Sequence, residues 1–211
     1  MSAAILHSSL NTWGRAEVEP QEDEFAHLVE KACAGDRGAF ASLVEQTYDR
    51  AYTVAYHTLR SPDDARDVVQ EAYVRVQKGL ADFQRQAKFT TWLYRVVVNL
   101  CLDSLRRKKV APITTDPVHL DVQDSRRSPE QLAGDGQLAV LLELGMAQLS
   151  EAHRVALVLY EVEGLSYEEI AKVTDARIGT VMSRLFHARK RMQQFLRQHL
   201  GDVVKDEADH E

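Results

Sequence analysis

The stretch from Gly164 to Met192 constrains the fold most, because it has the pattern of two helices joined by a tight turn. Ser166 precedes the first helix, and Glu169 stands three residues after Ser166, which is the capping-box pattern. Residues 174–177 are poor helix formers and fit the turn. Apolar residues at intervals of three and four then predict a second, longer helix. They are Val181, Leu185, Ala188, Met192, Phe195 and Leu196.

The second helix of this predicted helix-turn-helix carries positive charge and no negative charge. Residues 178–200 contain no Asp or Glu. Five of the residues in this stretch are basic: Arg184, Arg189, Lys190, Arg191 and Arg197. Small polar residues near the helix start suit a major groove, and the arginines suit phosphates. The alternative is an ordinary helical hairpin with a solvated basic face.

The formal net charge of −6 does not exclude a nucleic-acid partner, because the charges are segregated. Acidic residues concentrate before residue 25 and after residue 201. Basic residues concentrate in residues 85–109 and 184–197. Such a distribution says more about partners than the total does.

Other function classes find little support in the sequence. Cys33 and Cys101 have no CxxC spacing and no nearby histidine, so we expect buried, reduced thiols and no metal site. Glycine-rich phosphate loops and catalytic motifs are missing, so we expect neither an enzyme nor a cofactor. With no membrane-length apolar run and no signal peptide, a cytoplasmic location is expected.

Helical periodicity and the position of prolines predict an all-α chain of two small domains. The first domain covers residues 24–109, with a helix start at Ser61 and Pro62, and the second covers residues 137–200. Residues 110–136 form an extended acidic linker with three prolines. A flexible N-terminal extension (1–23) and an acidic tail (201–211) complete the predicted organisation.

Two sets of motifs resemble bacterial sigma factors. Residues 64–73 (DARDVVQEAY) and 89–99 (FTTWLYRVVVN) resemble region 2 of these proteins. Residues 149–154 (LSEAHR), 163–171 (EGLSYEEIA) and 179–185 (GTVMSRL) resemble region 4. The linker between them is short and has no helical region 3 domain, as in the extracytoplasmic-function class (group IV). The resemblance covers nearly the whole predicted folded chain.

The resemblance implies an alternative sigma factor that binds RNA polymerase core, through its β′ clamp and β flap, and promoter DNA. An anti-sigma factor is a further implied partner. The residues implied to bind core are Asp67, Gln70, Glu71 and Arg75. The residues implied to bind the −10 element are Phe83, Arg85, Lys88, Asn99, Arg106, Arg107, Lys108 and Lys109. The residues implied to bind the −35 element are Thr180, Met182, Ser183, Arg184, Phe186, His187, Arg189 and Lys190.

Several alternatives stay open on sequence alone. Relatives often carry basic residues at the positions of Met182 and His187, so the departure here leaves the promoter sequence open but not the fold. Trp92 has the pattern of a core aromatic, and the polar face of the 62–80 helix could be merely solvated. The linker could be a plain tether. A response-type regulator is the main rival, but it would need an upstream domain with strands, and residues 43–109 read as helices only.

Overall fold

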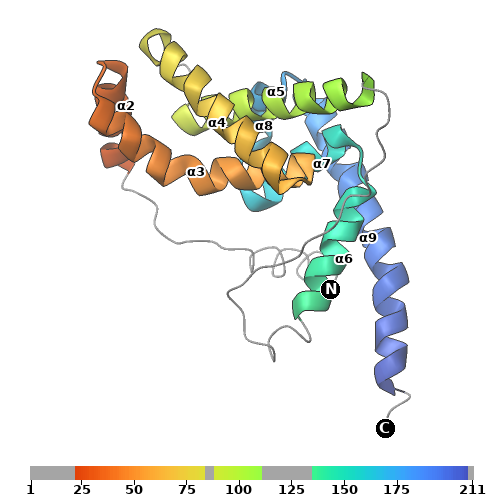
Figure 1. Cartoon of the computed structure of the whole chain (residues 1–211). Helices are drawn as coiled ribbons and strands as arrows, with labels where there is room; N and C mark the ends of the chain where they lie inside the picture. The colour runs from red at the N-terminus through yellow and green to blue at the C-terminus, as the bar shows by residue number, and fades with distance from the viewer. Residues whose placement is uncertain (1–21, 84–87, 111–134, 209–211) are drawn as a thin grey trace.

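The computed structural model describes residues 22–83, 88–110 and 135–208, and all regular elements within these ranges are helical (Figure 1). The all-α prediction is therefore confirmed. Most of the predicted N-terminal extension and of the linker lies outside the described residues. The first half of the chain forms α2 (Glu22–Cys33), α3 (Arg37–Leu59), α4 (Pro62–Gly79), the short 3-10 helix η1 (Leu80–Asp82) and α5 (Phe89–Val110).

Local signals in the sequence set the ends of these helices. The Asp36 side chain accepts hydrogen bonds from the amides of Gly38 (2.8 Å) and Ala39 (3.1 Å), which caps α3. Ser61 accepts from the amide of Asp64 at 3.4 Å, and Pro62 follows it as the first residue of α4. Arg60 separates α3 from α4 in a left-handed conformation, with a φ of 59°. The predicted start at Ser61 and Pro62 is thus confirmed.

The second half of the chain begins with α6 (Asp135–Ala147) and α7 (Glu151–Leu157). The last turn before Gly164 is a π-helix, η2 (Val158–Val162), which continues directly from α7. The helix-turn-helix follows as α8 (Tyr167–Thr174) and α9 (Ile178–Ala208). In Figure 1, α6 runs beside α9, and the C-terminal part of α9 extends away from the other helices.

The helix α9 is longer than the periodicity predicts, since the expected end was Leu200 and the helix continues to Ala208. Part of the predicted acidic tail is therefore helical. The reason is that a single glycine at residue 201 costs a helix only about 1 kcal/mol relative to alanine, and no proline follows it.

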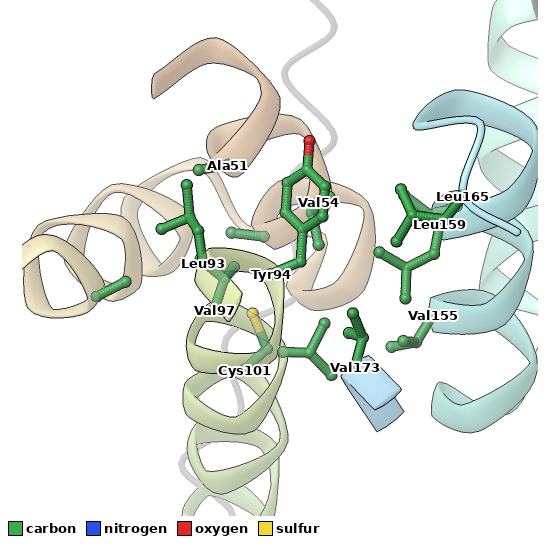
Figure 2. Close-up of a cluster of buried hydrophobic side chains, with 14 of the residues drawn as sticks. Ala51, Val54, Leu93, Tyr94, Val97, Cys101, Val155, Leu159, Leu165 and Val173 are labelled. Carbon is green, nitrogen blue, oxygen red and sulfur yellow. The ribbon is translucent and has the colours of Figure 1, made fainter. Parts of the chain in front are cut away.

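The two halves share one apolar core, which the sequence patterns do not predict. Helix α5 packs on α8, and α3 packs on α7 and η2. Figure 2 shows Leu93, Tyr94 and Val97 of the first half facing Leu159 and its neighbours of the second half. The side chains at this junction are almost fully buried: Ala51, Val54, Leu93, Tyr94, Val97, Cys101, Val155, Leu159, Leu165 and Val173. We call this cluster the junction core.

We expect the junction core to contribute strongly to the stability of the fold. Replacing Leu159, which is fully buried, with alanine should cost about 2–5 kcal/mol of unfolding free energy, because it leaves a cavity. The exposed Leu144 is a matched control whose change to alanine should stay within about 0.5 kcal/mol. Urea denaturation followed by circular dichroism measures both values. Hydrogen exchange should also accelerate in α5, in the other half. Unchanged exchange in α5 would contradict a shared core.

Candidate nucleic-acid interface

The helix-turn-helix is built as its sequence predicts. Ser166 accepts from the Glu169 amide at 3.2 Å, and the Glu169 carboxylate accepts from the Ser166 amide at 2.9 Å, which completes the capping box. The turn contains no glycine. Instead Asp175 takes the left-handed conformation, with a φ of 49°, and its amide donates to the carbonyl of Ala171. Asp is one of the few side chains that adopts this conformation readily.

One face of α9 is buried and the rest is open to solvent. Val181, Leu185, Ala188 and Met192 are buried, as their spacing predicts. The residues predicted to reach the −35 element are mostly exposed on the same helix: Thr180, Met182, Ser183, Phe186, His187 and Lys190 are exposed, and Arg184 is half-buried. The ring of Phe186 meets that of His187 edge-on, with centroids 5.3 Å apart. The helix therefore presents a mixed polar and aromatic surface.

A second histidine ring lies beside His187. The ring of His153, on α7, lies 6.1 Å from the ring of His187. Partial burial, followed by the charges of His187 and Arg184, holds the pKa of His153 below its ordinary value.

The structure places Arg189 differently from the expectation that it contacts phosphate. Its guanidinium forms an ion pair with Glu161 of η2, with Nε 2.8 Å from Oε1. It also lies over the ring of Tyr160 at 4.7 Å from the centroid. These contacts raise its pKa against the effect of burial. The ion pair attaches α9 to η2, and Glu161 would compete with a DNA phosphate for this guanidinium.

The C-terminal half of α5 is basic and exposed. Asn99, Arg106, Arg107 and Lys108 are exposed along it. Arg106 pairs with Asp103 at 3.2 Å, and Lys108 pairs with Asp64 of α4 at 2.5 Å. Burial raises the pKa of Asp64, but hydrogen bonds from Lys108 and Ser61 and the Lys108 charge outweigh it, so the pKa falls. Arg85 and the side chain of Lys109 lie outside the described residues.

Aromatic rings gather where η1 meets the start of α5. Phe83 stacks on Trp92 with centroids 4.8 Å apart, and Phe89 meets both rings edge-on. Phe25 of α2 adds a fourth ring, 6.0 Å from Phe89. A Cβ on Gly79 would lie 3.2 Å from the Trp92 ring, so α4 approaches closely here. Trp92 is thus a half-buried packing residue, as expected, and Phe83 is held against it.

The helix α4 presents a mainly polar face to solvent. Asp67, Gln70, Glu71 and Arg75 are all exposed on it, and Arg75 pairs with Glu71 at 2.5 Å. Val74 lies among them and is 49% exposed. Sequence periodicity gave no reason to single out Val74.

Buried polar contacts join the two halves beside the junction core. The Glu163 carboxylate, whose side chain is only 3% exposed, accepts hydrogen bonds from Arg50 Nε (2.9 Å) and the Tyr94 hydroxyl (2.5 Å). Burial, then the nearby Glu163 charge, raises the pKa of Tyr94 far above its usual range, so the hydroxyl remains a donor. Lys88, a predicted −10 residue, lies 3.6 Å from Glu169 of α8. The two predicted DNA-binding regions are therefore connected.

A second buried cluster joins α3 to α6 and α7. The Glu143 carboxylate lies 3.6 Å from His57 Nδ1 and 3.9 Å from Arg60 Nε. Arg154 is also buried and donates to the carbonyl of Met146 at 3.3 Å. Burial, then the Arg154 charge, lowers the pKa of His57 to about 4. At neutral pH this imidazole is uncharged, and burial raises the pKa of Glu143.

Sequence reasoning missed both polar clusters. Glu163 is a motif residue, but nothing in its local spacing identifies a partner in the other half. A weak signal exists for His57, which is the one titratable side chain on the buried face of α3. Among the described residues no group of His, Cys, Asp and Glu is placed to hold a metal ion. Nor do those residues include a helix long and apolar enough to cross a membrane.

Comparisons with known proteins agree with these motifs. The family model described as Sigma-70 region 2 matches residues 43–110, and the one described as Sigma-70, region 4 matches residues 139–192. The chain is 34% identical over 192 residues to the ECF RNA polymerase sigma factor SigE of Mycolicibacterium smegmatis, covering 89% of this chain and 74% of that protein. This chain belongs to the extracytoplasmic-function sigma factors of the sigma-70 family. Sigma factors of this kind direct transcription initiation.

Further relatives of this sigma factor extend the comparison. The RNA polymerase sigma-H factor of Pseudomonas aeruginosa is 32% identical over 190 residues, which cover 86% of this chain and 98% of the relative. Among solved structures, CnrH in complex with the cytosolic domain of CnrY matches with a TM-score of 0.59 and 25% identity, over 80% of this chain and 94% of that one. RpoE of Bartonella quintana, at 20% identity and a TM-score of 0.58, supports the fold over 75% of this chain and 96% of that one.

The buried imidazole of this sigma factor makes its stability depend on pH. The pKa of His57 is about 4 in the folded chain and 6.5 ordinarily, so the unfolded chain takes up the proton first as the pH falls. This contribution to stability is complete above about pH 6.5 and is lost toward pH 4, and it amounts to about 2 kcal/mol between pH 7 and pH 5.

His57→Gln should remove that part of the pH dependence, because glutamine does not titrate. The measurement is urea unfolding at pH 7 and pH 5. His27→Gln, at an exposed position on α2, is the matched control and should keep the wild-type difference. An equal pH 7 to pH 5 difference in wild type and His57→Gln would contradict a neutral, buried His57.

Proposed function

We propose that three exposed surfaces of this sigma factor have separate binding roles in transcription initiation. The polar face of α4, with Asp67, Gln70 and Glu71, binds RNA polymerase core at the β′ clamp. The exposed part of α5 and the Phe83 loop bind the −10 element. The solvent face of α9 binds the −35 element, and the second domain also contacts the β flap. The chain supplies no active site, and it works in the cytoplasm with the polymerase.

The observation that carries this proposal is the asymmetry of charge along α9. Residues 178–200 have no carboxylate, and Lys190 and Arg184 stand beside exposed side chains of the helix start. Phosphate contacts position a protein on DNA, and side chains at the start of a recognition helix reach base edges. An ordinary hairpin with a solvated face would not need to exclude acidic residues over such a length.

The −10 surface is proposed from α5. Asn99 is exposed although valines precede it, so it is available to a base that leaves the stack. Unstacking a base costs a few kcal/mol, and a preformed site must offset this. Phe83 stacks on Trp92, which holds its ring at the end of η1. Arg106 and Arg107 then stand further along the helix, where they meet backbone phosphates.

Binding both promoter elements requires the two halves to separate. The −10 and −35 elements are about 25 base pairs apart, which is about 85 Å at ~3.4 Å per base pair. In the structure α8 of the helix-turn-helix packs directly on α5 of the −10 surface. The described arrangement is therefore a closed form, and the proposed open form lacks the Glu163 and junction-core contacts. An anti-sigma factor is proposed as a partner that holds the closed form. RpoE of Bartonella quintana, a structural neighbour of this chain, was solved in complex with the anti-sigma factor NepR, which motivates this part of the proposal.

The experiment that tests the function is run-off transcription with purified core polymerase. The double change Asp67→Lys and Glu71→Lys should weaken core binding at least tenfold, because it reverses two charges on the proposed clamp-binding face. The loss of run-off product should follow the loss of binding. Fluorescence titration of labelled protein with core measures the affinity.

The chain offers a matched control for this variant. Glu45 and Asp49 on α3 are also exposed carboxylates four residues apart, and changing both to lysine should leave core affinity within about twofold. Circular dichroism verifies that both variants stay folded. Wild-type affinity of the α4 variant, or an equal loss in the α3 variant, would reject the α4 surface.

A further inference from the structure

The solvent face of α9 carries apolar side chains that its own domain leaves uncovered. Ile178, Met182 and Phe186 are 43%, 52% and 62% exposed. They stand four residues apart, so they line one side of the helix beside the buried face. We call these three residues the apolar stripe. Exposed apolar groups gathered in this way mark a binding surface.

The charges around the apolar stripe indicate its occupant. The stripe lies in the N-terminal half of α9, within a stretch that has no carboxylate from residue 178 to residue 200. Arg177 and Lys190 are exposed near its two ends. Asp175, just before Arg177, is an exposed carboxylate, but the helix that carries the stripe has only cationic charges from residue 178 to residue 200. Such a helix matches the DNA major groove, which is lined by phosphates. A surface for an ordinary protein partner would more commonly carry charges of both signs.

Within the major groove the partner of an apolar side chain is specific. Thymine alone among the four bases presents a methyl group there, whereas guanine presents two acceptors that suit arginine or lysine. Met182 has no donor for guanine. Phe186 has none either, and its ring is oriented by the neighbouring His187 ring. Both side chains can therefore read thymine methyl groups, and neither can read a guanine edge by hydrogen bonding.

We infer that Met182 and Phe186 are specificity-determining residues that recognise thymine methyl groups in the −35 element, with Ile178 extending the same apolar contact at the helix start. This inference rests on the proposed −35 role of α9 and narrows it to a chemical group on the DNA. It also predicts that at least one A·T pair, with its thymine in a defined strand, is required in the −35 element.

The test removes the methyl group and nothing else. Holoenzyme first selects promoters from DNA with a randomised −35 region, and each thymine of the selected element is then replaced by deoxyuridine. Each methyl that contacts the stripe should contribute about fourfold in affinity, the effect of burying one methyl-sized apolar group. In Met182→Ala or Phe186→Ala holoenzyme, the thymine and deoxyuridine promoters should bind equally at the position that the missing side chain reads.

A matched control separates base reading from general attraction. Lys190→Ala should weaken thymine and deoxyuridine promoters by the same factor, because a phosphate contact does not sense the methyl group. Met182 and Phe186 are exposed, so their alanine variants should keep the fold, and core affinity verifies this.

Two results overturn the inference. One is equal affinity of wild-type holoenzyme for thymine and deoxyuridine at every selected position, which is also the result expected if the stripe binds an anti-sigma factor or a second copy of this chain. The other is a methyl effect that persists in both alanine variants. Either result leaves the −35 role of α9 intact, as long as holoenzyme still selects a −35 sequence. Failure to select any −35 sequence would instead reject the proposed function.

Discussion

The packing of α5 against α8 is the interaction on which the arrangement of this molecule depends. It brings the fully buried Val97 and Cys101 of one half against Val173 of the other. Burial raises the pKa of the Cys101 thiol to about 12, so it remains a neutral, apolar part of the core. Removing such side chains from water provides the driving force for the closed form, since burial of one aliphatic side chain contributes about 1.5–3 kcal/mol.

Glu163 has a different role at the same junction. A buried carboxylate contributes little net stability, because its desolvation offsets the attraction to its partners. Its hydrogen bonds to Arg50 and Tyr94 instead define how the halves fit together, since any other docking would leave the charge without these partners. When the halves separate, water can solvate all three groups. The junction therefore combines an apolar driving force with a polar contact that selects one arrangement and that solvent can replace.

The closed form leaves most of the proposed contact residues free while it holds them close together. Glu71 of α4, Asn99 of α5 and Phe186 of α9 are all exposed in it. Lys88 is different, because its ion pair with Glu169 places a carboxylate where DNA phosphate would compete. In the proposed mechanism, inhibition by the closed form would thus act mainly through the distance between the −10 and −35 surfaces. In this proposal, core polymerase binds the α4 face before the halves separate. The free energy of that binding then helps to separate the two halves at the junction.

Local features of this fold could be predicted from sequence, whereas contacts between distant residues could not. The capping box of Ser166 and Glu169 and the start of α4 at Ser61 depend on residues within one turn of each other. Buried and exposed faces of α9 follow from a period that the sequence displays. The Tyr94–Glu163 contact joins residues far apart in the chain, and neither residue's neighbours indicate the other.

Arg189 shows the same limit in the proposed site. Its charge and its place on α9 suggested a phosphate contact, and only the structure places the Glu161 carboxylate beside it. The face of α4 could be predicted as polar from its period, but Val74 emerged only from its exposure. Helix positions and amphipathic faces are thus readable from spacing. Whether a charged side chain forms an ion pair inside the fold or stays exposed for a partner depends on tertiary contacts, which spacing does not show.

The measurement that tests this account most directly is the distance between the two halves in the free protein and in the initiation complex. Site-specific labels that do not use cysteine can be placed at the exposed Gln77 of α4 and Gln194 of α9, and read by pulsed electron spectroscopy or energy transfer. The account predicts one defined distance in the free protein and an increase on the order of tens of ångströms in the promoter complex with core. An unchanged distance in an actively transcribing complex would contradict it.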